Sequence, residues 1–260
     1  MRLHGLLDAI PLGLLFVAKL LVAILSFEGG FRVGGRRLTE KKQEVVVRVL
    51  VAGMLSLLAL MLAFTFGAAA THFDARRQNV LNEANAIRMA FLRADLLPEP
   101  HRAEIRNLLR EYVDVRLEGV RSGNIEREIA RSEALHGRLW SEAAALREKA
   151  PGPFFAGDFI QPLSEIIAQH TRRMIVGLEF RIPNILWIVL YAIMSLAVAS
   201  IGYHTGITGR GRPLVVLAFI LSFSAVMFLI EDLDRPLQGF LKTSQQALSD
   251  LQRAMSDTCH

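Results

Sequence analysis

The stretch VLVAGMLSLLALMLAFTFGAAA, residues 49–70, contains no charged side chain and continues directly into a charged segment. About 20 apolar residues are enough to cross the hydrocarbon core of a bilayer. No glycine or proline separates this stretch from the charged segment, so we predict one helix over about 45–97, roughly 80 Å long. Pro98 and Pro100 are expected to end it. In its second half, apolar residues recur at three- and four-residue spacing, as in an amphipathic helix: Val80, Leu81, Ala84, Ile87, Phe91 and Leu92.

Three more apolar segments complete the pattern. We predict membrane spans over 8–27, 47–70, 183–204 and 214–231, with Lys19 inside the first of them. They pair into two hairpins, within 1–70 and 182–236. The charged segment 71–181 between them has helical periodicity and no alternation typical of strands. The sequence therefore predicts an all-α integral membrane protein with four transmembrane helices, an antiparallel helical bundle outside the membrane, and a short helical tail over 237–260.

Helix signals divide the bundle further. We predict helices over 101–117, 125–150 and 159–181, with Gly157 and Asp158 at the entry of the last one. Pro183 is expected at the junction with the third span. After the first span, residues 28–37 are rich in glycine and arginine, and this composition favours a tight basic hairpin.

The distribution of basic residues along the chain predicts its orientation in the membrane. The chain of 260 residues has a formal net charge of +5, and basic residues gather in the short segments 28–44 and 205–213. Short positive segments favour the cytoplasm, so we expect a multi-pass protein of a bacterial inner membrane with the bundle outside the cytoplasm. Acidic residues are interleaved with the basic ones, which argues against nucleic acid as a partner.

The sequence contains no motif typical of an enzyme. We find no nucleophile elbow, phosphate-binding loop or metalloprotease motif, and we predict no catalytic residue, cofactor or metal site. Cys259 is the only cysteine, so an internal disulfide and a thiolate metal site are excluded.

Charged residues in or near spans are the main candidates for function, because charge in a membrane is costly. Glu231, Asp232 and Asp234 end the fourth span and would form a ring of carboxylates around a pore in a symmetric oligomer. The alternative is a structural helix end that pairs with its neighbours. Lys19 would either line a pore for anions or pair between helices, and an acid on the fourth span is a possible partner.

Other positions, most of them polar, are candidates for structural motifs. They lie after the first span, in the membrane-proximal part of the long helix, and at the end of the fourth span: Glu28, Gly30, Arg32, Arg77, Glu83, Asn85, Arg235 and Pro236. Glu83 and Asn85 would gain interest if they faced the interior of the bundle. A solvated helix face explains most of the other charges.

Several stretches resemble the bestrophin-like domain family: residues 28–37, 73–77 with 82–87, 92–98 through 110–112, and 232–239. Together they cover nearly the whole chain in the order typical of the family. Bestrophins are pentameric anion channels with four spans and a helical domain, so the resemblance implies a similar architecture and a channel. No pore sequence of bestrophins matches a span here, and Asp232, Asp234 and Arg235 carry over only as part of the family's own motif.

The first hypothesis for function is therefore a homo-oligomeric ion channel, with a pentamer as the first guess for the subunit number. The acidic cluster favours cations, whereas Lys19 and the resemblance favour anions, and we lean slightly to cations. Its expected partners are further copies of the chain, the lipid bilayer and inorganic ions. The rival hypotheses are an anion channel of bestrophin type and a membrane-anchored sensor or scaffold without a conduction pathway.

Overall fold

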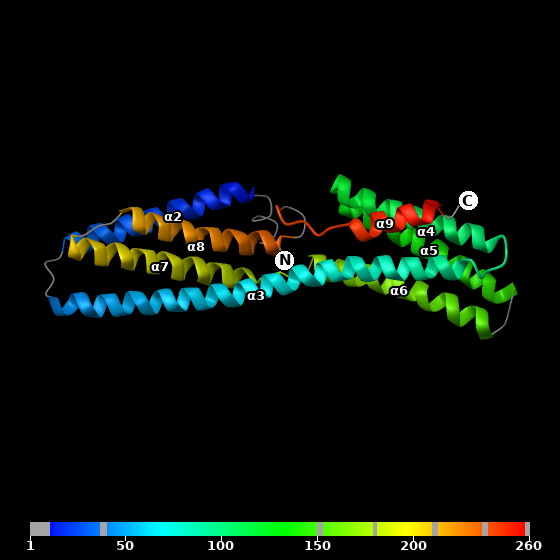
Figure 1. The fold of residues 1–260 in the computed structure, drawn as a ribbon, viewed down its shortest axis with the longest axis horizontal. Helices are drawn as coiled ribbons and strands as arrows, with labels where there is room; N and C mark the ends of the chain where they lie inside the picture. Colours follow the sequence, from blue (N-terminus) through cyan, green and yellow to red (C-terminus); the bar gives the residue numbers. More distant parts are fainter. Residues whose placement is uncertain are drawn as a thin grey trace. The chain divides into compact units, whose positions relative to one another are not determined.

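The computed structural model describes residues 11–36, 41–149, 153–178, 181–209, 213–235 and 239–257, and the regular structure within these ranges is entirely helical. Figure 1 shows the helices. In chain order they are α2 (Leu12–Gly35), α3 (Lys41–Ala94), α4 (His101–Ser122), α5 (Ile125–Lys149), α6 (Pro153–Leu178), α7 (Asn184–Thr208), α8 (Pro213–Asp234) and α9 (Gln246–Asp257). The prediction of an all-α protein is confirmed. Pro236 and Cys259 lie outside the described residues.

The long helix predicted after the second apolar stretch is confirmed, because α3 runs unbroken from Lys41 to Ala94. The hairpin predicted over residues 28–37 is wrong, since α2 continues through Glu28 to Gly35. Glycine favours loops when nothing compensates for its flexibility. Here Gly30 and Gly34 lie against the backbone of another helix, as described below, and that packing holds the segment helical.

Two boundaries in the bundle also differ from the prediction. Helix α4 passes Gly119 and ends at Ser122, and its C-cap Gly123 has a φ of 70°, the left-handed conformation that glycine adopts at helix ends. Helix α6 begins at Pro153, so the predicted entry at Gly157 is wrong. Proline suits the first turn of a helix because the backbone N–H that it lacks has no helical partner there. Pro183 is the N-cap of α7, at the junction where it was expected.

One compact unit contains the membrane helices and comprises Met1–Phe73 and Arg181–Lys242. Helices α2, α3, α7 and α8 are long and apolar enough to cross a membrane, so the protein is a multi-pass membrane protein. Figure 1 shows α2, α7 and α8 running side by side. Their shared core includes Leu58 of α3, Met194 of α7 and Met227 of α8, all buried.

Helices α2 and α7 approach each other at backbone contact. A Cβ atom built on Gly30 would lie 1.9 Å from the carbonyl oxygen of Ala199, and one on Gly202 would lie 2.1 Å from that of Phe27. Gly34 and Gly206 continue the same seam, one turn further along each helix. Small residues at four-residue spacing allow such approach in membrane helices, where packing replaces the hydrophobic effect.

The second compact unit comprises Asp74–Phe180 and Thr243–His260. The C-terminal part of α3, together with α4, α5 and α6, surrounds a core that includes Ile87, Leu139 and Leu163. The tail also belongs to this unit, because α9 buries Leu248, Leu251 and Met255 in the same core. We refer to this unit as the bundle.

Candidate functional site

The lysine inside the first span pairs with an acid on α8. The Nζ atom of Lys19 lies 2.5 Å from Oε2 of Glu231, and the two side chains are 3% and 8% exposed. Tyr191 of α7 donates a hydrogen bond to the other carboxylate oxygen of Glu231. Phe228 lies beneath the ammonium group, 5.8 Å from Nζ to the ring centre. Three helices therefore meet at one buried charge pair, and the pairing alternative for Lys19 is the one that the structure contains.

The next carboxylate on α8 caps the segment that follows the helix. Asp232 is 2% exposed, and its two oxygens accept the backbone N–H groups of Phe240 at 2.7 Å and of Leu241 at 2.9 Å. Gly239 lies so close that a Cβ atom there would be 2.6 Å from Oδ1 of Asp232. A carboxylate that accepts two backbone N–H bonds is strongly held, because each bond is charge-assisted.

The last carboxylate ties α8 to the start of α7. Asp234 accepts the backbone N–H of Ile182 at 3.0 Å and is buried. Arg235 is buried as well, and its backbone N–H bonds to the carbonyl of Glu231. All three carboxylates of the predicted acidic ring thus have partners within their own unit. This geometry favours the structural alternative, in which the end of α8 joins neighbouring segments.

Of the remaining predicted motif residues within the described ranges, Gly30 and Glu83 are placed in tight packing. Glu28 and Arg32 form an exposed pair along α2, with 2.8 Å between Oε1 and Nε. Arg77 and Asn85 are exposed on α3. A solvated face accounts for these side chains.

Glu83 lies at the centre of a second buried cluster, in the bundle. It is fully buried, and Nε of Arg116 lies 2.8 Å from Oε1. Arg173 of α6 lies 2.7 Å from Oε2, and the hydroxyl of Tyr112 donates to Oε1 at 2.8 Å. Arg116 also pairs with Glu128 of α5. The cluster therefore joins α3, α4, α5 and α6 around two carboxylates and two guanidinium groups.

Two histidines extend this cluster. The His136 ring lies 5.0 Å from the ring of Tyr112 and 4.9 Å from that of His170, measured between centres. Burial, followed by the nearby Arg116 charge, lowers the pKa of each histidine to about 4. Burial raises the pKa of the Tyr112 hydroxyl well above its usual value, and the Glu83 carboxylate adds to this. The Nε2 atoms of His136 and His170 are buried without a hydrogen-bond partner.

Sequence reasoning singled out Glu83 but missed the residues that surround it. Arg116 follows Tyr112 by four positions, so both lie on the apolar stripe of α4. A charged side chain on a buried stripe signals a partner inside the core. No comparable pattern marks His136, His170 or Arg173, because both polar and apolar residues neighbour each of them in the sequence.

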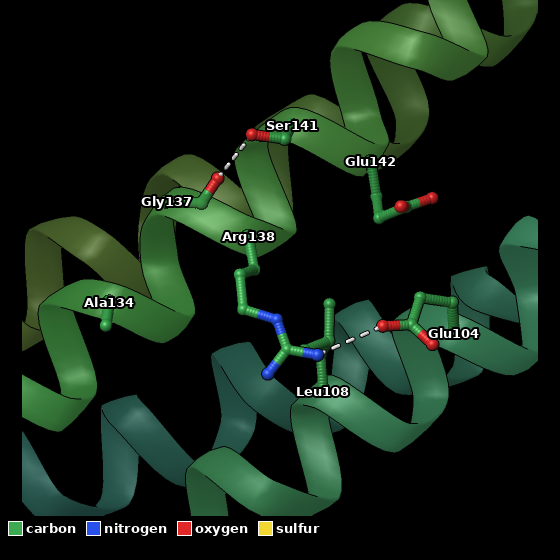
Figure 2. Close-up of a pocket in the computed structure, with 7 residues that line it drawn as sticks. All are labelled: Glu104, Leu108, Ala134, Gly137, Arg138, Ser141 and Glu142. Atoms are coloured by element: carbon green, nitrogen blue, oxygen red, sulfur yellow. Dashed lines mark hydrogen bonds and ion pairs between the residues drawn. The ribbon is translucent and has the colours of Figure 1, made fainter.

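A surface hollow of about 400 Å³ lies between α4 and α5 (Figure 2). Figure 2 shows Arg138 of α5 reaching across to Glu104 of α4, at 3.2 Å between Nη2 and Oε1. Glu142 pairs with His101, and Ser141 donates to the carbonyl of Gly137. The polar side chains Glu104, Arg138, Ser141 and Glu142 thus each have a partner of their own and do not converge on a free centre. In the part of the chain that the structure describes, no three histidine, cysteine or carboxylate side chains are placed to hold a metal ion.

Known proteins identify this architecture. The bestrophin-like domain matches residues 16–248 of the chain. Two crystal structures of a bacterial bestrophin homologue from Klebsiella pneumoniae share the fold over 93% of this chain and 96% of theirs. The one that carries a substitution has a TM-score of 0.67 at 16% identity, and the other 0.60 at 15%. No curated protein sequence matches the chain.

Proposed function

The chain belongs to the bestrophin-like domain family, and from this premise we propose that it forms a homo-oligomeric ion channel. Four helices of one subunit leave little room for a wet pathway. A pore therefore requires several subunits around an axis. The pentamer implied by the family resemblance is our first expectation, and native mass spectrometry of the detergent-solubilised complex would count the 28.9 kDa subunits.

The observation that carries this proposal is the uncovered face of α3. Only 11% of its most apolar window is buried, the smallest share of the four membrane helices, against 17% for α2, 28% for α8 and 33% for α7. Leu57, Leu60 and Phe64 lie on one side of the helix and are 48%, 51% and 67% exposed. Gly53 and Gly67 lie on the same side, and Cβ atoms built on them would meet nothing within 4 Å. We call these five residues the α3 ridge.

The α3 ridge supports a pore of a particular kind. If several subunits turn this ridge towards a common axis, the pathway is lined by apolar and small residues and carries no formal charge at that level. A narrow apolar lining excludes water, so it acts as a gate by dewetting. We therefore expect a hydrophilic replacement of Phe64, such as Phe64→Ser, to raise conductance.

The type of ion that the channel conducts, cation or anion, is a separate part of the proposal. A cation-selective ring at Asp232 and Asp234 was the first expectation, and Lys19 was the argument for anions. Each of these side chains has a partner inside its own subunit, and this weakens both arguments. The reversal potential of the wild-type channel in a salt gradient will assign cations or anions directly.

A cysteine scan tests the α3 ridge. Cys259 is the only native cysteine, so Cys259→Ser gives a cysteine-free background. Single cysteines at Leu57, Leu60 and Phe64 should react with a charged, membrane-impermeant methanethiosulfonate reagent and change the current through reconstituted protein. Leu25 of α2 is the matched control, because it is apolar and 69% exposed but lies off α3. A cysteine at Leu25 should leave the current unchanged.

Two outcomes contradict the proposal. Purified wild-type protein without conductance in planar bilayers, under gradients of both potassium and chloride, would favour the sensor or scaffold hypothesis. Conductance that responds equally to cysteines at Leu25 and at Leu57 would retain the channel but reject the α3 ridge as its lining.

We also propose that the bundle lies outside the cytoplasm, in a bacterial inner membrane. The basic residues of the two short segments support this orientation. Cys259 follows α9, which belongs to the bundle unit. An impermeant maleimide should therefore label Cys259 in spheroplasts without lysis. A cysteine in place of Arg36, in the Cys259→Ser background, should be labelled only after lysis, and the reverse result would invert the topology.

A further inference from the structure

The two histidine rings of the bundle lie edge to face in a site with little tolerance for positive charge. His136 comes from α5 and His170 from α6, and they are 7% and 4% exposed. Nδ1 of His170 lies 3.5 Å from the Tyr112 hydroxyl, and that hydroxyl already donates to Glu83. Neither Nε2 atom has a hydrogen-bond partner. A proton added at Nε2 would therefore create a buried N–H donor without an acceptor.

The charges around the rings add to this cost. Glu83 faces them from α3, Tyr112 and Arg116 from α4, Glu128 from α5, and Arg173 from α6. The two carboxylates are already occupied by the two guanidinium groups, so the surroundings have no spare negative charge. Arg116 repels a proton on either ring, and protonation of one ring repels protonation of the other.

We propose that His136 and His170 form an acid-sensitive latch, which holds α5 and α6 together while both rings are neutral and releases them when the rings take up protons. The cluster also reaches the tail, because Nη2 of Arg173 lies 3.4 Å from the side-chain oxygen of Gln245, just before α9. Opening at the histidines therefore loosens the contacts of four helices and of the segment that leads into α9. This inference concerns the bundle alone and does not depend on ion conduction.

The linkage between protonation and folding gives the direction of the pH effect on the stability of the bundle. Each ring has a pKa of about 4 in the closed bundle and about 6.5 when exposed to water. A lowered pKa in the folded state means stability that is fully present above about pH 6.5 and is lost as the pH falls towards 4. Between about pH 7 and pH 5.5, each ring should raise the opening equilibrium about eightfold, and the two together about sixtyfold. Exposed carboxylates remain ionised over that range.

Hydrogen exchange of the full-length protein in nanodiscs tests the latch. Amides in peptides from α5 and α6 should exchange at least tenfold faster at pH 5.5 than at pH 7, after correction for the intrinsic rate. The double variant His136→Gln, His170→Gln cannot take up these protons and should lose the acid response. The single variant His101→Gln is the control, because His101 lies in the same bundle and pairs with Glu142 at 2.8 Å. It should respond as the wild type does.

A second measurement keeps the test decisive if the double variant does not fold. Exchange of the imidazole C2 proton, followed by mass spectrometry of wild-type protein, reports the pKa of each histidine. Values below about 5 for His136 and His170 support the latch. Values near 6.5, an amide response below threefold, or an unchanged acid response in a folded double variant would each overturn it.

Discussion

The ammonium group of Lys19 and the carboxylate of Glu231 lie 2.5 Å apart inside the membrane unit, although 212 residues separate them in the sequence. The pair joins α2 to α8, and Tyr191 adds α7 through its hydrogen bond to Glu231. The two side chains are 3% and 8% exposed, so water solvates neither charge well. The two charges therefore depend on each other far more than a surface pair does.

Breaking this pair should destabilise the membrane unit strongly. Lys19→Met leaves a buried carboxylate and Glu231→Gln leaves a buried ammonium group, so each should cost about 3–5 kcal/mol in free energy of unfolding. The combined variant Lys19→Met, Glu231→Leu, Tyr191→Phe removes all three polar partners and should recover most of that loss. Denaturant titration in detergent measures the free energy of unfolding of each variant. A cost below about 1 kcal/mol for both single variants would show that the charges are solvated.

Alanine substitutions at two adjacent glycines of α2 should have different effects, because only one of them lies in the glycine seam between α2 and α7. Gly30→Ala places a Cβ atom against the carbonyl of Ala199 and should separate the helices, with a loss of about 2 kcal/mol or more. Gly29→Ala is the matched control, because its Cβ atom meets nothing within 4 Å, and alanine improves helix propensity by up to about 1 kcal/mol. Trp187 lies on α7, so its fluorescence in a Trp140→Phe background follows this unit. Equal effects of the two alanines would argue against the close approach.

Sequence patterns predict features that depend on neighbouring residues, and they do not predict contacts between residues far apart in the chain. Long apolar runs and helical spacing act locally, and they predict the four spans and the unbroken α3. The hairpin at Glu28 was wrong because the partner of Gly30 lies 169 residues away, at Ala199. The same limit applies to the sites. Glu83 is conspicuous in its own helix, but its pairing with Arg116 and Arg173 depends on how four helices pack. No single-helix pattern contains that information.

Asp232 should act as a cap and leave ion selectivity unaffected. Asp232→Ala removes the acceptor of two backbone N–H groups, so the amides of Phe240 and Leu241 should exchange at least tenfold faster with solvent. Asp250→Ala is the control, because Asp250 is exposed and pairs with Arg253, both on α9. If the protein conducts, Asp232→Asn should keep the wild-type reversal potential. A clear shift in that potential would restore the acidic ring as the selectivity element.

Glu83 should be the most sensitive single position in the bundle. Glu83→Gln removes the carboxylate shared by Arg116 and Arg173 and leaves two guanidinium groups without it, so we expect a loss of about 3–5 kcal/mol. Glu118→Gln is the control, because Glu118 pairs with Arg131 at 2.6 Å on an exposed surface and should cost less than about 1 kcal/mol. Trp140 lies on α5 and, in a Trp187→Phe background, is the only tryptophan left to report unfolding of the bundle. If both variants unfold at the same denaturant concentration, the cluster around Glu83 does not hold the four helices together.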